Sequence, residues 1–448
     1  MLTTRHSLAL LGLCLGFTAC DSSTPSDPTG ADVPPSNTIQ AAAVGPYYVP
    51  TTLVTRRGTG TAINNKGQAI GFGSNAFIWQ NGVVRNLGSL GGNFTRAHAL
   101  NEVGQVVGYS YTTAGDAHAF LWQNGVMRDL GTLGAPFVWG QILSNATGIN
   151  AAGQIVGWGP TSDDMIGSRR AFLWENGRMT RLASLGQVHS LATGIDDLRR
   201  VVGQFGSPTT KPFRWVEGVV RSLGTLGGTS SSASAISGGK IVGWSETAAG
   251  QPRGFLWQSG VMTNLGTLGG DWSTAEGINS LGQVVGYARV QGSSIMRAYV
   301  WENGVMINLG IGQAHGINRN GWIVGERPNP RATRSLDLVP TVWKPSATPP
   351  VTPRASILVG NTFFYSEHNS SVQPTVDTVA VGTTVTWEWI NASRVGHSVQ
   401  SIGSPSFASS PIITTQDTKY RVTFTRPGTY QYNCVRHTAA MTGRVVVK

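Results

Sequence analysis

A segment of about 42 residues recurs seven times between residues 47 and 345, and this repeat constrains the fold more than any other feature. The second half of each copy places a tryptophan near the end of a short apolar run, as in the AFLWQNG of residues 119–125. The seven tryptophans are Trp79, Trp122, Trp174, Trp215, Trp257, Trp301 and Trp343. Repeats of this period stack into solenoids or propellers, so the repeat sets the architecture of most of the chain.

Each copy carries two signals for tight turns between strands and no helical periodicity. Asn-Gly follows the tryptophan in several copies, as at Asn81-Gly82 and Asn303-Gly304, and this dipeptide suits a turn whose two residues both need positive φ. A second turn begins with Asn and has Gly near its end, as in the INNKGQ of residues 63–68. Two hairpins give four short strands, which make one propeller blade. We therefore expect an all-β, seven-bladed β-propeller over residues 47–345.

The last copy ends at residues 340–345 without a fourth strand, and the stretch at residues 48–60 precedes the first copy without a partner. We expect residues 48–57 to form the outer strand of the seventh blade, so that both ends of the region close the ring. The repeated tryptophans are expected in the core between blades. The recurrent LGTLGG segments are not expected to bind phosphate, because neither a helix nor Lys-Ser/Thr follows them.

Two histidines, His98 and His315, occupy one repeat position that holds Thr, Ser or Glu in the other copies. Such a mixture predicts a turn or strand-end position and no metal site. The repeats resemble the HAF repeats of predicted extracellular bacterial proteins, and the letters HAF stand at residues 118–120. That resemblance implies an extracellular location and says little about activity.

The C-terminal segment carries a different pattern, in which Cys434, His437 and Met441 form C-x2-H-x3-M on a tight loop between two strands. A thiolate, an imidazole and a thioether suit copper, and one cysteine with two histidines and a weak axial methionine is the blue-copper ligand set. The second histidine is His397, which follows the alternating strand of residues 384–389. The remaining histidine nearby, His368, lies in a polar stretch and is expected to be solvated.

Residues 355–448 resemble the plastocyanin-like cupredoxin family through the PGTYxYxCxxH…MxGxVxV pattern at residues 427–447. The resemblance implies a β-sandwich with one mononuclear type 1 copper, His397, Cys434 and His437 as equatorial ligands and Met441 as the weak axial ligand. The loop between His437 and Met441 is one residue shorter than in plastocyanin. Ser398, beside His397, is the expected outer contact of the thiolate.

The N-terminus reads as an export signal, because Arg5 and His6 precede an apolar run of roughly ten residues, too short to span a bilayer. The FTAC at residues 17–20 resembles the lipobox of bacterial lipoproteins, which implies cleavage before Cys20 and acylation of its thiol. Ordinary signal cleavage nearby is the alternative. We expect a signal peptide at residues 1–19, a polar tether at 20–46 and a Pro-rich linker at 346–354 before the cupredoxin domain.

The chain has a formal net charge of +11, 59 glycines and 12% charged residues, which suits an exported β protein that is attracted to anionic surfaces. The basic residues form no continuous stripe, so nucleic acid is not expected as a partner. Expected partners are a redox protein or an anionic cell-surface component, with membrane contact through the N-terminal lipid only. We expect a monomer in the periplasm or at the cell surface.

Three classes of function fit these features. The first is an electron-transfer or copper-binding protein whose propeller is a docking platform, and the second is an adhesion or scaffold protein without redox work. A propeller followed by a cupredoxin domain is also similar in architecture to nitrous oxide reductase. That family needs two cysteines in its copper loop and many propeller histidines, which this chain lacks. We therefore expect no enzymatic activity and no catalytic residues. Of the three classes, we favour the electron-transfer or copper-binding protein.

Overall fold

The computed structural model describes residues 47–134, 141–162, 169–182, 189–206, 208–291, 294–329, 337–346, 354–359, 364–366, 375–389, 396–415, 418–438 and 441–448. Cys20, His368 and most of the predicted linker lie outside these ranges, as do the predicted signal peptide and tether. The described part is all-β, as predicted. It contains no helix long and apolar enough to cross a membrane.

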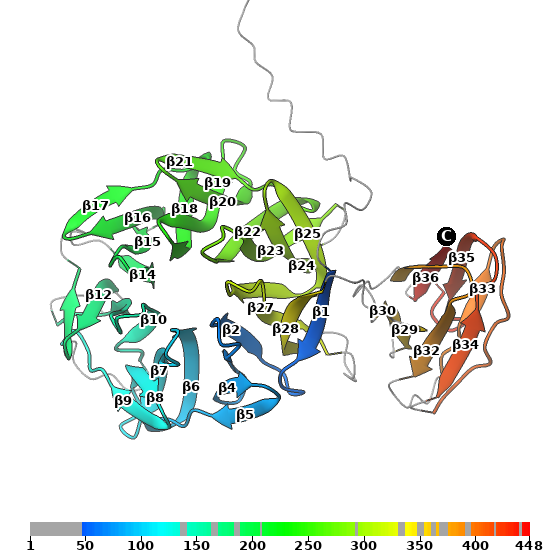
Figure 1. Ribbon diagram of the computed structural model, residues 1–448, viewed down its shortest axis with the longest axis horizontal. Coiled ribbons are helices and arrows are strands. Elements are labelled where there is room, and N and C mark those ends of the chain that lie inside the picture. Colours follow the sequence, from blue (N-terminus) through cyan, green and yellow to red (C-terminus); the bar gives the residue numbers. More distant parts are fainter. Residues whose placement is uncertain are drawn as a thin grey trace, which may run out of the picture. The chain divides into compact units, whose positions relative to one another are not determined.

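Seven four-stranded antiparallel sheets follow the seven repeats, and Figure 1 shows them arranged in a ring. Blade 1 contains β2 (Thr59–Ile63), β3 (Ala69–Phe72), β4 (Ala76–Gln80) and β5 (Val83–Asn86). Blade 2 contains β6 (Gly91–Leu100), β7 (Val106–Thr112), β8 (Ala117–Gln123) and β9 (Val126–Asp129). Blade 3 contains β10 (Asn145–Ile149), β11 (Ile155–Gly159), β12 (Arg170–Glu175) and β13 (Arg178–Arg181).

The remaining blades have the same order of strands. Blade 4 contains β14 (Ser190–Ile195), β15 (Val201–Phe205), β16 (Lys211–Val216) and β17 (Val219–Ser222). Blade 5 contains β18 (Gly227–Ser237), β19 (Lys240–Thr247), β20 (Pro252–Gln258) and β21 (Val261–Asn264). Blade 6 contains β22 (Gly269–Ile278), β23 (Val284–Val290), β24 (Met296–Glu302) and β25 (Val305–Ile311). Blade 7 contains β26 (Gln313–Ile317), β27 (Ile323–Pro328), β28 (Leu338–Ser346) and, from the start of the described chain, β1 (Tyr47–Thr52).

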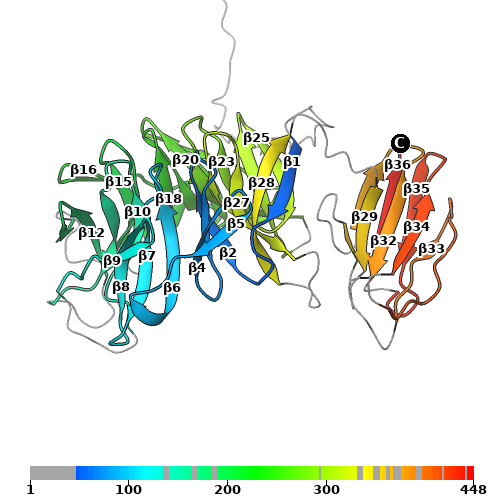
Figure 2. The same cartoon turned by 60° about the horizontal axis from the view of Figure 1, so that its bottom comes forward.

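The pairing of β1 with β28 confirms the predicted outer strand of the seventh blade. The two strands are antiparallel, and their register runs from Tyr47 opposite Ser346 to Thr52 opposite Thr341. The blue β1 lies beside the yellow β28 in both views (Figure 1; Figure 2). The seventh blade therefore takes one strand from one end of the repeat region and three from the other.

The predicted turns form as expected, because Asn81 and Gly82 both have positive φ, at 50° and 85°. Glu217, which replaces Asn in the fourth copy, also has a positive φ of 46°. The repeated tryptophans lie in the core between blades, and Trp122, for example, packs against Ile70 and Ile78 of blade 1. Two of the seven, Trp257 and Trp301, are only half-buried.

Asparagines in the turns between the first and second strands join neighbouring blades. Each of these asparagines accepts backbone N–H groups of its own turn and donates its side-chain amide to the turn of the next blade. These bonds between turns run from Asn64 to Asn101 O (3.1 Å), Asn101 to Asn150 O (3.1 Å), Asn150 to Asp196 O (3.1 Å), Asn279 to Asn318 O (2.9 Å) and Asn318 to Asn64 O (2.9 Å). The last bond joins blade 7 to blade 1.

Blade 5 is joined to its neighbours in another way. Its turn has Ser237 where most copies have Asn, and blade 4 has Asp196, whose carboxylate cannot donate. Arg200 of blade 4 reaches the turn of blade 5, so closely that a Cβ on Gly239 would lie 2.8 Å from Nη1 of Arg200. Lys240 reaches Gly282 of blade 6 in the same manner, at 2.8 Å from the corresponding Cβ position. At both boundaries of blade 5 a cationic side chain thus lies against the next turn where other blades have the asparagine bond. Arg200 itself pairs with Asp196 of its own turn at 2.6 Å, and Thr193 of blade 4 donates to Ala233 O of blade 5 at 2.9 Å.

The repeat position of His98 and His315 is a β-bulge within the first strand of the blade, so the predicted turn or strand end was wrong. The register of β6 on β7 shifts between Ala97 and Ala99, and that of β26 on β27 shifts between Ala314 and Gly316. The extra residue of a bulge is left outside the regular ladder. Where the position holds threonine, its hydroxyl donates to a backbone carbonyl of the next blade, at 3.1 Å from Thr61, 2.7 Å from Thr147 and 2.9 Å from Thr193.

The C-terminal domain is a sandwich of two four-stranded sheets. One sheet has the order β30 (Phe364–Ser366), β29 (Arg354–Val359), β32 (Thr384–Trp389) and β34 (Lys419–Thr423). The other has the order β31 (Thr375–Val379), β36 (Thr442–Val447), β35 (Gly428–Asn433) and β33 (Gln400–Ile402). Apolar side chains from both sheets form one core, in which Trp387 and Tyr432 are fully buried and stand edge to face with ring centroids 5.3 Å apart.

Candidate metal centre

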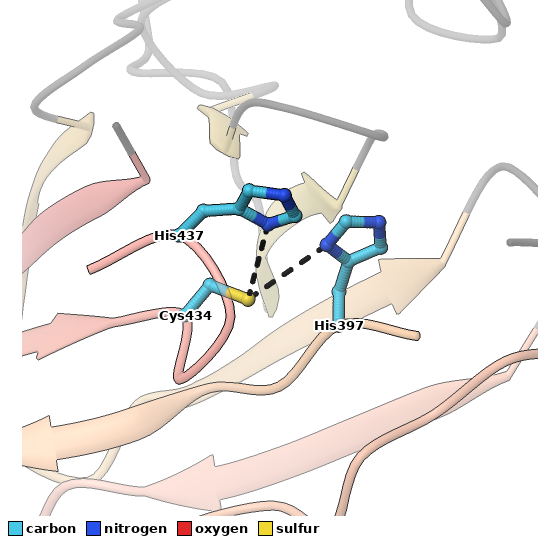
Figure 3. A group of neighbouring side chains, drawn as sticks. All are labelled: His397, Cys434 and His437. Atoms are coloured by element: carbon cyan, nitrogen blue, oxygen red, sulfur yellow. Dashed lines mark hydrogen bonds between the residues drawn. The ribbon is translucent and has the colours of Figure 1, made fainter. Parts of the chain in front are cut away.

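The predicted ligands His397, Cys434 and His437 come together at one end of the C-terminal sandwich (Figure 3). The Sγ atom of Cys434 lies 3.7 Å from Nδ1 of His397 and 3.8 Å from Nδ1 of His437. The two imidazole rings stack with centroids 5.1 Å apart. Both histidines therefore present Nδ1 to the thiol, although they come from separate loops.

Local backbone structure explains the position of His397. Its N–H and C=O bond the C=O and N–H of Ile413 at 3.0 and 2.8 Å, and Nε1 of Trp389 donates to its carbonyl at 3.3 Å. Gly396, with a φ of 69°, precedes it at a point where a Cβ would lie 2.5 Å from Ile412. Only glycine fits there without displacing Ile412. The close approach of the two segments therefore requires glycine directly before His397.

The loop from Cys434 to Met441 is closed by its own hydrogen bonds. The N–H of Cys434 donates to Met441 O at 3.0 Å, and the N–H of Met441 donates to His437 O at 2.8 Å. Cys434 and Met441 are both fully buried, whereas His437 is half-buried. The structure thus places Met441 on the same closed loop as the thiol, as the sequence predicted.

Ser398 lies beside His397, but its described contact is not with the thiol. Its buried hydroxyl accepts a hydrogen bond from the N–H of Val435 at 3.2 Å. That bond ties the segment that carries His397 to the start of the loop from Cys434 to Met441. Ser398 therefore holds the backbone next to Cys434, and its contact with the thiolate stays a prediction.

The donor set fits one copper ion by chemistry and by spacing. Donors bound to one first-row metal at about 2.0 Å for nitrogen and 2.3 Å for sulfur, in a trigonal plane, lie roughly 3.8 Å apart. The two Sγ to Nδ1 distances of 3.7 and 3.8 Å agree with this value. Burial, and then the neighbouring His437, lower the pKa of His397, which keeps its imidazole neutral and able to bind metal.

The C-terminal domain holds a buried acid that sequence reasoning missed. Asp377 is fully buried on β31, and the Ser366 hydroxyl donates to its Oδ1 at 2.6 Å. Within the described residues, its Oδ2 has no hydrogen-bond partner. Burial raises the pKa of Asp377 to about 7 in spite of the bond from Ser366. Its position in the alternating TVDTV of residues 375–379 gave no sign of this environment, because acids usually occupy the exposed face of such a strand.

We expect Asp377 to make the C-terminal domain less stable as the pH rises from about 4 to about 7, because the folded state holds its proton longer than the unfolded chain. A pKa raised from 3.8 to about 7 corresponds to roughly 4 kcal/mol at neutral pH. Asp377→Asn should abolish this slope. Hydrogen exchange of the β35 and β36 amides, corrected for its intrinsic pH dependence, measures it. Glu388→Gln, at a half-buried acid of the same domain, should keep the slope, and an unchanged slope in Asp377→Asn would contradict the assignment.

The C-terminal segment is similar to a family of copper proteins and to several solved cupredoxin structures. Residues 366–448 match the family described as copper binding proteins, plastocyanin/azurin family. Among solved structures, a purple cupredoxin from Nitrosopumilus maritimus is 27% identical, and the match covers 21% of this chain and 99% of that one with a TM-score of 0.17. A Cu(I) form of an amicyanin mutant is 28% identical, with 21% of this chain and 82% of that chain covered and a TM-score of 0.17. An oxidised amicyanin mutant is 26% identical, with 21% and 81% covered and a TM-score of 0.17.

The family match includes each of the four predicted ligands, and it ends at the last residue of the chain. The distances between Sγ and the two Nδ1 atoms place three of these four residues, His397, Cys434 and His437, around one point. From its fold, its donor set and this match, the C-terminal domain is a copper-binding cupredoxin domain of the plastocyanin/azurin family.

Proposed function

We propose that this chain is an exported, lipid-anchored copper protein that transfers one electron at a time through a mononuclear type 1 site. The observation that carries the proposal is the convergence of two imidazole Nδ1 atoms on one buried thiol. Bound copper would supply the redox chemistry by alternating between Cu(II) and Cu(I). We propose no enzymatic activity.

The protein's own residues limit how far the site can rearrange. His397 is held by two backbone bonds to Ile413 and one from Trp389, and the loop of Cys434 is closed on Met441. A site whose ligands are held in this way changes little between oxidation states, which lowers the reorganisation that accompanies electron transfer. His437 is half-buried and adjoins the exposed Val435, so electrons would enter or leave at this edge.

The remaining parts of the proposal extend the sequence analysis. Acylation of Cys20 would tether the protein to a membrane in the periplasm or at the cell surface. The propeller would then be the platform that meets a redox partner or an anionic surface component. The positive net charge of +11 supports an acidic partner.

Voltammetry of the copper-loaded full chain tests the electron-transfer function. We expect one copper ion per chain and a reversible one-electron wave whose potential is the same in both scan directions. Apoprotein loaded with zinc is the matched control, since zinc has no redox chemistry at this site and should give no wave. A protein that binds less than one copper ion, or that binds it without a reversible wave, would favour the scaffold function instead.

A further inference from the structure

One face of the propeller carries a set of exposed aliphatic side chains at two repeat positions. The turns between the first and second strands and those between the third and fourth strands leave each sheet at the same end, because successive strands are antiparallel. The asparagine bonds join these turns from blade to blade, so the turns of the joined blades belong to one face. We call it the turn face, and define it by the residues of these two sets of turns.

The exposed aliphatic residues of the turn face recur with the repeat. The first residue after the Asn-Gly type of turn is valine in five blades, and the tip of the other turn is valine or leucine in three. Their exposed fractions are 56% for Val83, 69% for Val126, 57% for Val219, 64% for Val261, 57% for Val305, 58% for Val103, 70% for Leu198 and 60% for Leu281. Single exposed valines need no explanation, but eight on one face at equivalent positions indicate a contact surface.

Between blades 1 and 2 the turn face is hollowed by a groove of about 650 Å³. Val83 and Val103 line this groove together with Trp122, and Arg85 lies on its wall. The groove therefore combines apolar side chains with a cation at the same place. A partner that fits this lining must offer both apolar groups and negative charge.

Exposed cations lie among the aliphatic tips and outnumber the free carboxylates. The exposed cations at or next to these turns are Lys66, Arg85, Arg128, Arg178, Arg221 and Arg319. Two of the exposed carboxylates are already used in contacts between blades, since Glu102 accepts from Asn65 and Asp197 accepts from the N–H of Ala151. Glu217 is a third exposed carboxylate of these turns, so the face presents apolar tips among an excess of cations.

We propose that the turn face binds the surface of an anionic lipid bilayer. The aliphatic tips would enter the boundary between headgroups and acyl chains, while the cations would pair with acidic headgroups. A second copy of the chain fits less well, because two such faces would bring like charges together. A purely polar anionic polymer would match the cations and leave the eight tips in water. The turn face would add a second membrane contact to the acyl chain expected on Cys20. This second contact would require neither copper nor the acyl chain.

Vesicle sedimentation of a chain that begins at residue 21 tests this proposal. This chain lacks both the apolar run of the expected signal peptide and the expected site of acylation at Cys20, so any binding must come from the rest of the protein. We expect binding to vesicles of equal parts phosphatidylglycerol and phosphatidylcholine and at least tenfold weaker binding to phosphatidylcholine alone. The binding should also weaken as salt is raised, because headgroup pairing is screened.

The tip variant carries Val83→Ser, Val126→Ser, Val219→Ser, Val261→Ser and Val305→Ser, and it should lose at least tenfold in vesicle binding. Serine at exposed turn positions leaves the core intact, and an unchanged melting temperature would verify this. The control variant carries Ile295→Ser, between the second and third strands of blade 6 at the opposite end of the sheet, and Val381→Ser, in the C-terminal domain. Both residues are exposed, and this variant should bind like the parent chain. No binding by the parent, equal binding by the tip variant, or concentration-dependent dimers that only the tip variant loses would overturn the proposal.

Discussion

Copper-loaded Cys434→Ser is expected to lack the intense visible absorption of the parent protein. That absorption arises when an electron moves from the cysteine sulfur to Cu(II), and a serine oxygen holds its electrons too tightly to reproduce it at the same wavelength. The Sγ of Cys434 lies within 3.8 Å of both imidazole Nδ1 atoms, where a shared copper ion would bind all three donors. Its loss should therefore remove the colour entirely, and an absorption spectrum after titration with Cu(II) measures this.

Met441→Leu is the matched variant for the same experiment. Met441 is buried on the closed loop, and leucine has nearly the same volume, so the fold should be kept. We expect copper and colour to remain and the reduction potential to rise, because a weak donor that stabilises Cu(II) has been removed. If Cys434→Ser kept the parent spectrum, or Met441→Leu lost copper, the assignment of roles to these two residues would be wrong.

Deletion of residues 47–57 is expected to cost the propeller several kcal/mol of its free energy of unfolding and to cause aggregation. Six residues of β1 pair with β28, and backbone hydrogen bonds contribute about 1 kcal/mol each, which gives roughly 5 kcal/mol. The deletion also removes the buried Leu53 from the core cluster that contains Val342 and leaves the edge of β28 unpaired. A domain is typically stable by only about 5–15 kcal/mol, so this loss is severe.

Thermal unfolding and light scattering measure this effect. A chain that lacks residues 30–40 is the control, because it is shortened by the same number of residues and retains all described strands. We expect the control to unfold at the parent temperature and to stay monodisperse. If the chain without β1 did the same, closure of the ring by β1 would contribute nothing measurable to its stability.

The sequence was sufficient to predict the blades, because each blade depends on turn residues that recur in the seven copies of the repeat. Asn81-Gly82 predicts its turn directly, whereas Glu217 adopts the same positive φ because its place in the repeat requires it. The exchange of β1 into blade 7 was also predictable, because one repeat lacked a strand and another stretch had no partner. These inferences rest on the number of repeat copies and the spacing of their residues. They need no knowledge of contacts between distant segments.

Features that depend on contacts between distant segments were not predictable in the same way. The bulge at His98 is a shift of register between β6 and β7, and nothing in the residue types marks it. The hydrogen bond from the N–H of Val435 to the hydroxyl of Ser398 joins segments 37 residues apart, and no residue pattern marks it. Asp377 has the alternation of an ordinary strand residue, and only the packing of the second sheet shows that it is buried.

The two boundaries of blade 5 have a consequence for how the ring comes apart. A closed ring of repeats has no free end from which to fray, so its first opening must occur between two neighbours. Amide donation from asparagine joins five of the seven pairs of neighbouring turns, whereas no such bond joins blade 5 to blade 4 or to blade 6 within the described residues. We therefore expect the ring to open first on either side of residues 227–264.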